Sequence, residues 1–123
     1  MIDRRSGAVD YVARTSVLKI ATELRNREEV VTPIWGVVVD GAPYIRSGYG
    51  AESHWYRRAQ RTGRAALVDD DTSYPVAIEN VDDEAINREV DRAYEAKYAG
   101  EGNALREMVA AWLRQFTMRL KPL

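Results

Sequence analysis

A short stretch near the middle of the chain combines a cation, a hydroxyl group and two glycines. It runs from Arg46 through Ser47, Gly48 and Tyr49 to Gly50. Glycine lets the backbone turn tightly and bring its N–H groups close to a ligand. Arginine offers a planar fork of donors that fits a phosphate in two-point contact. The stretch is therefore a candidate phosphate-binding loop, and it matches neither a Walker A loop nor the GxGxxG fingerprint.

A basic helix is expected directly after this loop. Ser53 is a suitable N-cap, "HWYRRAQRT" follows it, and Gly63 ends the segment. Helix N-termini attract phosphate through their free N–H groups and the helix dipole. Arg57 and Arg61 stand four residues apart beside Arg58, and an anion between two such like charges would relieve their repulsion. We extend the candidate phosphate site to these arginines; the alternative is an ordinary solvated loop and helix.

Aromatic residues gather around the same part of the sequence. Trp35, Tyr44, Tyr49, Trp55 and Tyr56 all lie within or next to it. Aromatic rings beside a phosphate site suit a ligand with a flat ring system and a phosphate tail. In the alternative interpretation, the two tryptophans are core anchors of a small domain.

Charge is divided unevenly along the chain. The formal net charge is −1 and the pI is near 5.9, which argues against a nucleic-acid partner. Residues 42–66 hold five arginines against one glutamate, and residues 69–91 hold nine acidic residues against one arginine. This division indicates either two solvated faces that pair across a dimer or a basic third that holds an anionic ligand.

The composition excludes several classes of site. There are no cysteines and one histidine, His54, so disulfide scaffolds, thiol catalysis and zinc ribbons are excluded and a metal site is not expected. His54 has no suitably placed nucleophile or carboxylate, so no catalytic residue is assigned. The polar run from Asp69 to Ser73 does not fit a calcium loop, which needs glycine at its sixth position.

No apolar run approaches the roughly 18 residues of a membrane span, and no signal-peptide core is present. The expected location is the cytoplasm, with no membrane partner.

Alternation of apolar and polar residues predicts mostly β structure. We expect one domain that covers residues 1–123, in which residues 1–14 form a loosely ordered or helical N-terminal segment. Strands are expected at 16–24, 30–40, 43–47, 64–68, 74–81 and 116–123, and helices at 54–62, 83–99 and 103–111. Pro33 indicates an edge, a bulge or a strand end, and Asp40-Gly41 a hairpin turn. Hairpins dominate this order, which favours a small antiparallel barrel whose openings are covered by helices.

The stretch "TPIWGVVVDGAPYIRSGYGAESHWYRRAQRTGRAAL", followed by "VDDEAINREVDRAYEAKY" and "TMRLKPL", resembles the bacterial family DUF2255. The most telling parts are 32–35, 44–47 and 55–57, and the resemblance covers roughly residues 16–123. That family is similar to the FMN-binding split-barrel superfamily, which includes pyridoxamine-phosphate-oxidase-like proteins and F420-dependent nitroreductase-like proteins.

The resemblance implies a mainly β, α+β fold: a six-stranded antiparallel split β-barrel that forms a homodimer and holds a flavin in a groove between subunits. It implies FMN as cofactor, with F420 or no cofactor as alternatives, and an oxidoreductase activity. The cofactor-binding residues would be Thr32, Ile34, Trp35 and Trp55 along the ring, and Arg46, Ser47, Arg57, Arg58 and Arg61 at the phosphate. Arg46→Ala would then weaken flavin binding far more than folding. The alternative is a non-catalytic small-molecule-binding or interaction module with no flavin.

Overall fold

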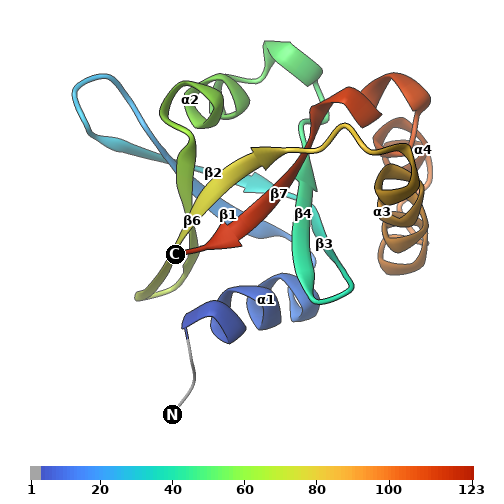
Figure 1. The fold of residues 1–123 in the computed structure, drawn as a ribbon, viewed down its shortest axis with the longest axis horizontal. Helices are drawn as coiled ribbons and strands as arrows, with labels where there is room; N and C mark the ends of the chain where they lie inside the picture. Colours follow the sequence, from blue (N-terminus) through green and yellow to red (C-terminus); the bar gives the residue numbers. More distant parts are fainter. Residues whose placement is uncertain (1–3) are drawn as a thin grey trace.

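A seven-stranded antiparallel sheet, curled into a half-barrel, forms the centre of the protein (Figure 1). The structure is a computed structural model that describes residues 4–123. The strands are β1 (Leu18–Glu23), β2 (Glu29–Ile34), β3 (Gly36–Val39), β4 (Ala42–Arg46), β5 (Arg64–Asp69), β6 (Thr72–Asn80) and β7 (Thr117–Pro122). Their order across the sheet is β2-β1-β5-β6-β7-β4-β3. The predicted class is confirmed, but the barrel has seven strands where six were expected.

The additional strand arises because the apolar run expected as one strand at 30–40 divides at Trp35. Its first half, β2, pairs with β1, where Ile34 lies opposite Leu18. Its second half, β3, pairs with β4, where Gly36 lies opposite Ile45. The two halves therefore lie at opposite edges of the sheet, and the chain between them draws those edges together. We call residues 34–36 the strand junction.

Two side chains at the end of α3 (Glu84–Lys97) and just beyond it hold the strand junction. The Gly36 N–H donates to Tyr98 Oη at 3.1 Å, and Lys97 Nζ donates to Gly36 O at 2.7 Å. Lys97 Nζ also donates to Val12 O at 2.6 Å, which joins the N-terminal helix to the same point. The Trp35 ring stacks on the Tyr98 ring, with centroids 4.2 Å apart and planes 7° apart. Side chains thus provide hydrogen-bond partners for the N–H and C=O groups of Gly36.

Lys97 makes the stability of the fold depend on pH. Burial lowers the pKa of its ammonium group from 10.5 to about 8. Between these values the unfolded chain binds more protons than the folded chain, so the free energy of unfolding rises with pH. We expect the free energy of unfolding to rise less with pH in Lys97→Met than in wild-type protein. The measurement is the change in Tm between about pH 7.5 and 9.5 for each protein. This range lies below the one in which tyrosines ionise. The exposed Lys19 supplies the control Lys19→Met; equal slopes in the two variants would contradict the assignment.

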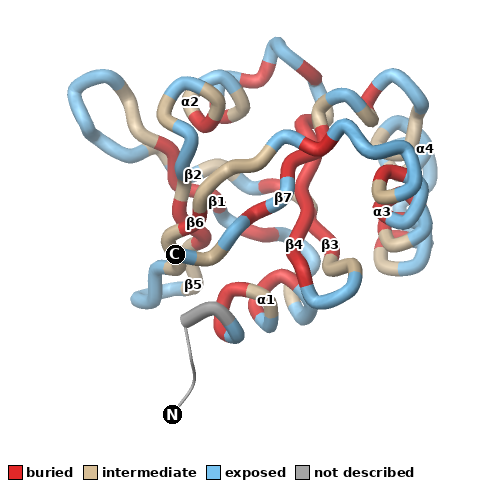
Figure 2. The backbone as a smooth tube through the Cα atoms, in the orientation of Figure 1, coloured by how far each residue is buried: buried red, intermediate tan, exposed pale blue. Residues whose placement is uncertain are grey.

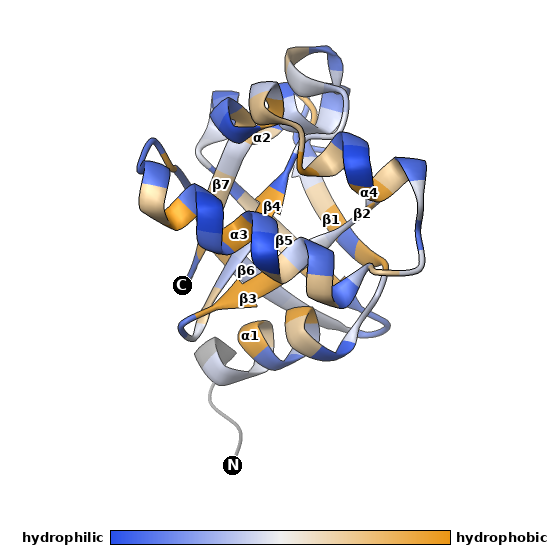
Figure 3. Ribbon diagram, turned by 90° about the vertical axis from the view of Figure 1, so that its right-hand side faces the viewer, coloured by the Kyte–Doolittle hydropathy of each residue, from blue (hydrophilic) through white to orange (hydrophobic). Residues whose placement is uncertain are grey.

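Helices close the barrel around an apolar interior that consists of two clusters. They are α1 (Arg4–Arg14), η1 (Gly50–Glu52), α2 (His54–Thr62), α3 (Glu84–Lys97), α4 (Asn103–Met108) and η2 (Ala111–Phe116). In Figure 1, α1 lies below the barrel and α2 above it, and α3 and α4 lie to one side. Figure 2 shows the buried residues concentrated on the strands and on the face of α1 that meets them. Figure 3 shows α3, which alternates polar and apolar segments, in front of the apolar strand β3.

Local signals set the ends of these helices. Asp83 caps α3, since its side chain accepts from the Ile86 N–H at 3.0 Å, and Gly63 ends α2 with a left-handed φ of 71°, as predicted. Ser53 occupies the N-cap position of α2, but its side chain makes no capping hydrogen bond. Residues 1–14 were predicted to be loosely ordered or helical. Within this segment, α1 is helical from Arg4 to Arg14, and residues 1–3 lie outside the described residues.

Candidate functional site

A groove opens beside the strand junction, between β2, the loop after β4 and α4. Its volume is about 280 Å³, near the lower end of the range for small-ligand pockets. Its apolar walls come from Pro33, Ile34, Trp35, Trp55, Ala104 and Met108. Its remaining lining comes from Arg46, Gly48, Tyr49, Ser53 and Glu107. We call this site the junction groove.

The structure brings together part of the predicted binding set. Ile34, Trp35, Trp55 and Arg46 all line the junction groove, although they come from three separate segments of the chain. Ser47 is buried behind it, with its Oγ 2.9 Å from the Oγ of Ser53, which lines the groove. The other predicted residues do not line it: Thr32, Arg57, Arg58 and Arg61.

Arg46 is the centre of a buried hydrogen-bond network, and its side chain is 0% exposed. Its Nε donates to Thr117 Oγ1 at 2.8 Å. Its Nη1 donates to Asp91 Oδ1 at 2.5 Å and to Met108 O at 3.2 Å. Its Nη2 donates to the backbone and side-chain oxygens of Asn87, both at 3.1 Å. A guanidinium group has five N–H donors, so none is left for a phosphate. The side chain instead ties α3, α4 and β7 to β4.

Arg46 shares its carboxylate partner with a second cation. Asp91 Oδ2 also accepts from Arg114, at 3.0 Å from its Nε and 2.7 Å from its Nη2. The Arg46 guanidinium carbon lies 5.6 Å from the centre of the Tyr94 ring, a distance suited to a cation–π contact. Burial raises the pKa of the Tyr94 hydroxyl, so that group stays neutral. A paired and fully hydrogen-bonded cation is the form in which arginine tolerates burial.

The arginines of α2 contact the protein outside the groove. Arg57 Nε donates to Ala51 O at 2.7 Å, which holds the η1 turn against the helix. Arg58 Nε donates to Thr22 Oγ1 at 2.8 Å, and Arg61 donates to the carbonyl of the last residue of β1. These contacts hold α2 to its neighbours, and none of the three arginines lines the groove.

Sequence reasoning missed the partners of Arg46 and the contribution of α4. Asp91 was counted with the acidic third of the chain, and Asn87 was not singled out. A signal existed, because Asn87, Asp91, Tyr94 and Tyr98 recur at helical spacing along the buried side of α3. Polar residues within a buried stripe need partners. Glu107, which contributes a carboxylate to the groove, carried no comparable signal.

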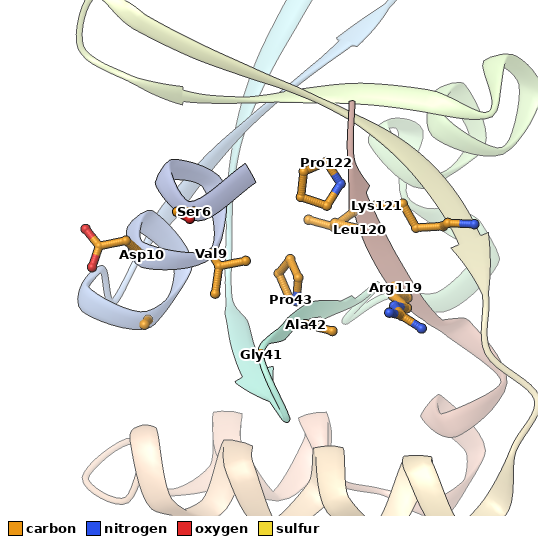
Figure 4. A pocket seen from close by; sticks show the side chains of 11 residues that line it. Ser6, Val9, Asp10, Gly41, Ala42, Pro43, Arg119, Leu120, Lys121 and Pro122 are labelled. Carbon is orange, nitrogen blue, oxygen red and sulfur yellow. The ribbon is translucent and has the colours of Figure 1, made fainter. Parts of the chain in front are cut away.

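A second, wider hollow of about 650 Å³ lies between α1, the β3–β4 turn and β7 (Figure 4). The side chains of Val9, Pro43 and Pro122 border it, whereas those of Arg119 and Lys121 extend away from it (Figure 4). Specific ligand sites combine apolar walls with a few convergent polar groups. Because these cations do not converge on the hollow, the junction groove is the better candidate site.

The described residues give no sign of a metal or membrane-spanning site. No group of three or more His, Cys, Asp or Glu side chains within residues 4–123 is arranged to hold a metal ion. In the same range, no helix combines the length and the apolar character that crossing a bilayer requires.

The curled antiparallel sheet and the divided strand define a split β-barrel with a groove beside the strand junction. The chain belongs to the bacterial family described as "Uncharacterized protein conserved in bacteria (DUF2255)", which matches residues 8–120. The predicted family membership is therefore confirmed. No curated protein sequence matches the chain.

Solved structures share this fold at low sequence identity. The conserved hypothetical protein Rv2991 from Mycobacterium tuberculosis aligns with 98% of this chain and 79% of its own, at 18% identity and a TM-score of 0.67. An F420-H2 dependent reductase (FDR-A) aligns with 86% of this chain and 94% of its own, at 11% identity and a TM-score of 0.63. The FAD binding protein from Mycobacterium smegmatis aligns with 95% of this chain and 88% of its own, at 17% identity and a TM-score of 0.57. The TM-scores establish a common fold.

Proposed function

We propose that the junction groove binds the ring system of a flavin or deazaflavin and that the protein is an oxidoreductase dependent on that cofactor. The observation that carries this proposal is the fixed aromatic slot at the strand junction. Trp35 is held by its stack on Tyr98, and Ile34 and Trp55 are buried beside it. Proteins of the same fold include an F420-H2 dependent reductase and an FAD binding protein, which supports a ligand of this class.

The residues present fit the ring of such a cofactor better than its phosphate. Trp35, Trp55 and Ile34 would contact the ring faces and edges, and Tyr49, which is 80% exposed, would lie at the mouth of the groove. Arg46 acts as a positioning residue, since it holds the C-terminal end of α4 through Met108 O. When bound, the cofactor would supply the redox chemistry. The protein binds the ring, orients it and limits access of water.

A homodimer belongs to this proposal. β2 is an edge strand of the sheet, and Val31 on it is 50% exposed. An unpaired, apolar edge is usually covered in a soluble protein, and a second copy would cover it together with the open side of the groove. Sedimentation velocity on the sample used for ligand titration tests this part. A monomer at micromolar concentration would contradict it.

Ligand titration tests the function. We expect FMN or F420 to bind wild-type protein with a sub-micromolar Kd, which corresponds to about 8 kcal/mol or more, measured by the change in ligand fluorescence. Trp35→Ala should raise that Kd about tenfold, because it removes an aromatic stacking partner as well as apolar contact area. Trp112→Ala is the matched control, since Trp112 is 55% exposed and does not line the groove. Equal losses in the two variants would place the ligand elsewhere.

The second candidate is a non-catalytic binding module with no flavin. One observation favours it: the cation predicted to hold the cofactor phosphate, Arg46, has every donor engaged within the protein. Absence of binding by FMN, riboflavin and F420 in the same titration would select this candidate and reject the first.

A further inference from the structure

The cations around the junction groove are all committed to protein partners. Arg46 is buried, pairs with Asp91 at 2.5 Å and shares that carboxylate with Arg114. All five of its N–H groups donate to protein oxygens. Arg57 is exposed, with its Nε on Ala51 O and its Nη2 3.6 Å from Glu52, and it does not line the groove. Within the described residues, the lining therefore holds no cation with a free donor.

One charged side chain of the lining remains unpaired. Glu107, on α4, lines the groove and is exposed. Among the side chains that the structure describes, residues 6–123, none forms an ion pair or hydrogen bond with its carboxylate. A carboxylate without a cationic partner repels an anion that approaches it, and the repulsion weakens as salt screens it. The groove thus combines apolar walls with one carboxylate that no described cation contacts.

We propose that the groove recognises the uncharged ring of its ligand and that Glu107 disfavours a phosphate close to that ring. The inference rests on the proposed function, because it assumes that a flavin-type ring occupies the groove. It narrows the ligand class to planar heteroaromatic rings whose tail is neutral, or whose anionic part extends out of the groove.

The test compares riboflavin with FMN, which differ by one phosphate. Both are titrated into wild-type protein, Glu107→Gln and Glu95→Gln, at low salt and at about 0.5 M salt, where the Debye length is only a few ångströms. Glu95 is an exposed carboxylate of α3 that does not line the groove, so its variant controls for the loss of one negative charge.

We expect wild-type protein to bind FMN no more tightly than riboflavin. Glu107→Gln should strengthen FMN binding relative to riboflavin by about three- to fivefold, the size typical of exposed charge interactions, and added salt should remove most of that change. Glu95→Gln should leave the ratio of the two dissociation constants unchanged.

Two outcomes overturn this inference and leave the proposed function standing. One is tighter binding of FMN than of riboflavin by about tenfold or more in wild-type protein, with the preference lost in Arg57→Ala, which would identify a rearranged Arg57 as the phosphate contact. The other is an unchanged ratio in Glu107→Gln. If neither ring binds, the proposed function fails and this inference fails with it.

Discussion

Arg46→Met lowers the free energy of unfolding by about 3–5 kcal/mol, the range found when one partner of a buried ion pair is removed. The variant leaves Asp91 paired only with the half-exposed Arg114. It also removes one donor from Thr117 Oγ1 and one from Asn87 Oδ1, although Asn87 Oδ1 keeps a hydrogen bond from the Thr117 hydroxyl at 2.6 Å. A buried acceptor left unsatisfied costs about 1–3 kcal/mol. The measurement is urea denaturation followed by circular dichroism, with a check that the slope m is unchanged.

Arg92→Met is the matched control for this expectation. Arg92 pairs with Glu89 at 2.6 Å, but both side chains are more than half exposed, and such pairs contribute about 0–1 kcal/mol. If Arg46→Met proves too unstable to measure, Arg46→Lys keeps the charge and loses the planar fork, and we expect it to fold with intermediate stability. A difference of less than about 1 kcal/mol between Arg46→Met and Arg92→Met would show that the network is not a major source of stability.

This expectation reverses the one drawn from the sequence. A cation at the end of a strand, followed by a hydroxyl and two glycines, predicted that Arg46→Ala would affect ligand binding more than folding. The structure surrounds Arg46 with acceptors from α3, α4 and β7. We therefore expect a large effect on folding, with any effect on ligand binding following from displacement of α4.

Gly36→Ala is the second large effect that we expect, with a loss of about 1–3 kcal/mol from overpacking. A Cβ atom at Gly36 would lie 2.5 Å from Leu18 Cδ1, 3.2 Å from Ile45 Cγ2 and 3.3 Å from the backbone oxygen of Tyr44. Leu18 and Ile45 are both 0% exposed, so neither has free space to move into. Because Trp35 is the preceding residue, the same variant should also weaken flavin binding.

Gly100→Ala controls for the general effect of adding a methyl group. A Cβ at Gly100 meets open space, and its φ is not in the left-handed region, so we expect a change between zero and about 1 kcal/mol of stabilisation. Thermal unfolding of both variants, with Tm converted to free energy at a common temperature, gives the comparison. Equal stability of Gly36→Ala and wild-type protein would mean that the strand junction is loosely packed.

Local patterns in the sequence predicted much of the fold. The Asp40-Gly41 turn is confirmed. The φ values of these residues are 49° and 76°, and a two-residue type I′ hairpin turn requires positive φ at both positions. Helix α2 begins and ends where its flanking residues indicated. The number of strands could not be predicted in the same way, because the apolar run from Val30 to Val39 continues through the junction. Which edge each half joins depends on partners elsewhere in the chain.

The candidate site was harder to predict because its chemistry depends on long-range contacts. Arg46 meets Asp91 and Thr117 across 45 and 71 residues of sequence. A count of charges along the chain assigned Asp91 to an acidic region and Arg46 to a basic one. Only the fold shows that these two charges neutralise each other, whereas the aromatic walls, Trp35 and Trp55, were identified from their types and neighbours.

The strand junction also restricts how the length of this segment can change. Side chains along a strand alternate between the two faces of a sheet, so a shift of one residue moves every side chain to the opposite face. Lys97 and Tyr98 fix the backbone at Gly36, and β2 and β3 extend from that point along opposite edges of the same sheet. A single inserted or deleted residue on either side of Gly36 would therefore turn part of one edge inside out, whereas a change of two residues would preserve which side chains face the interior.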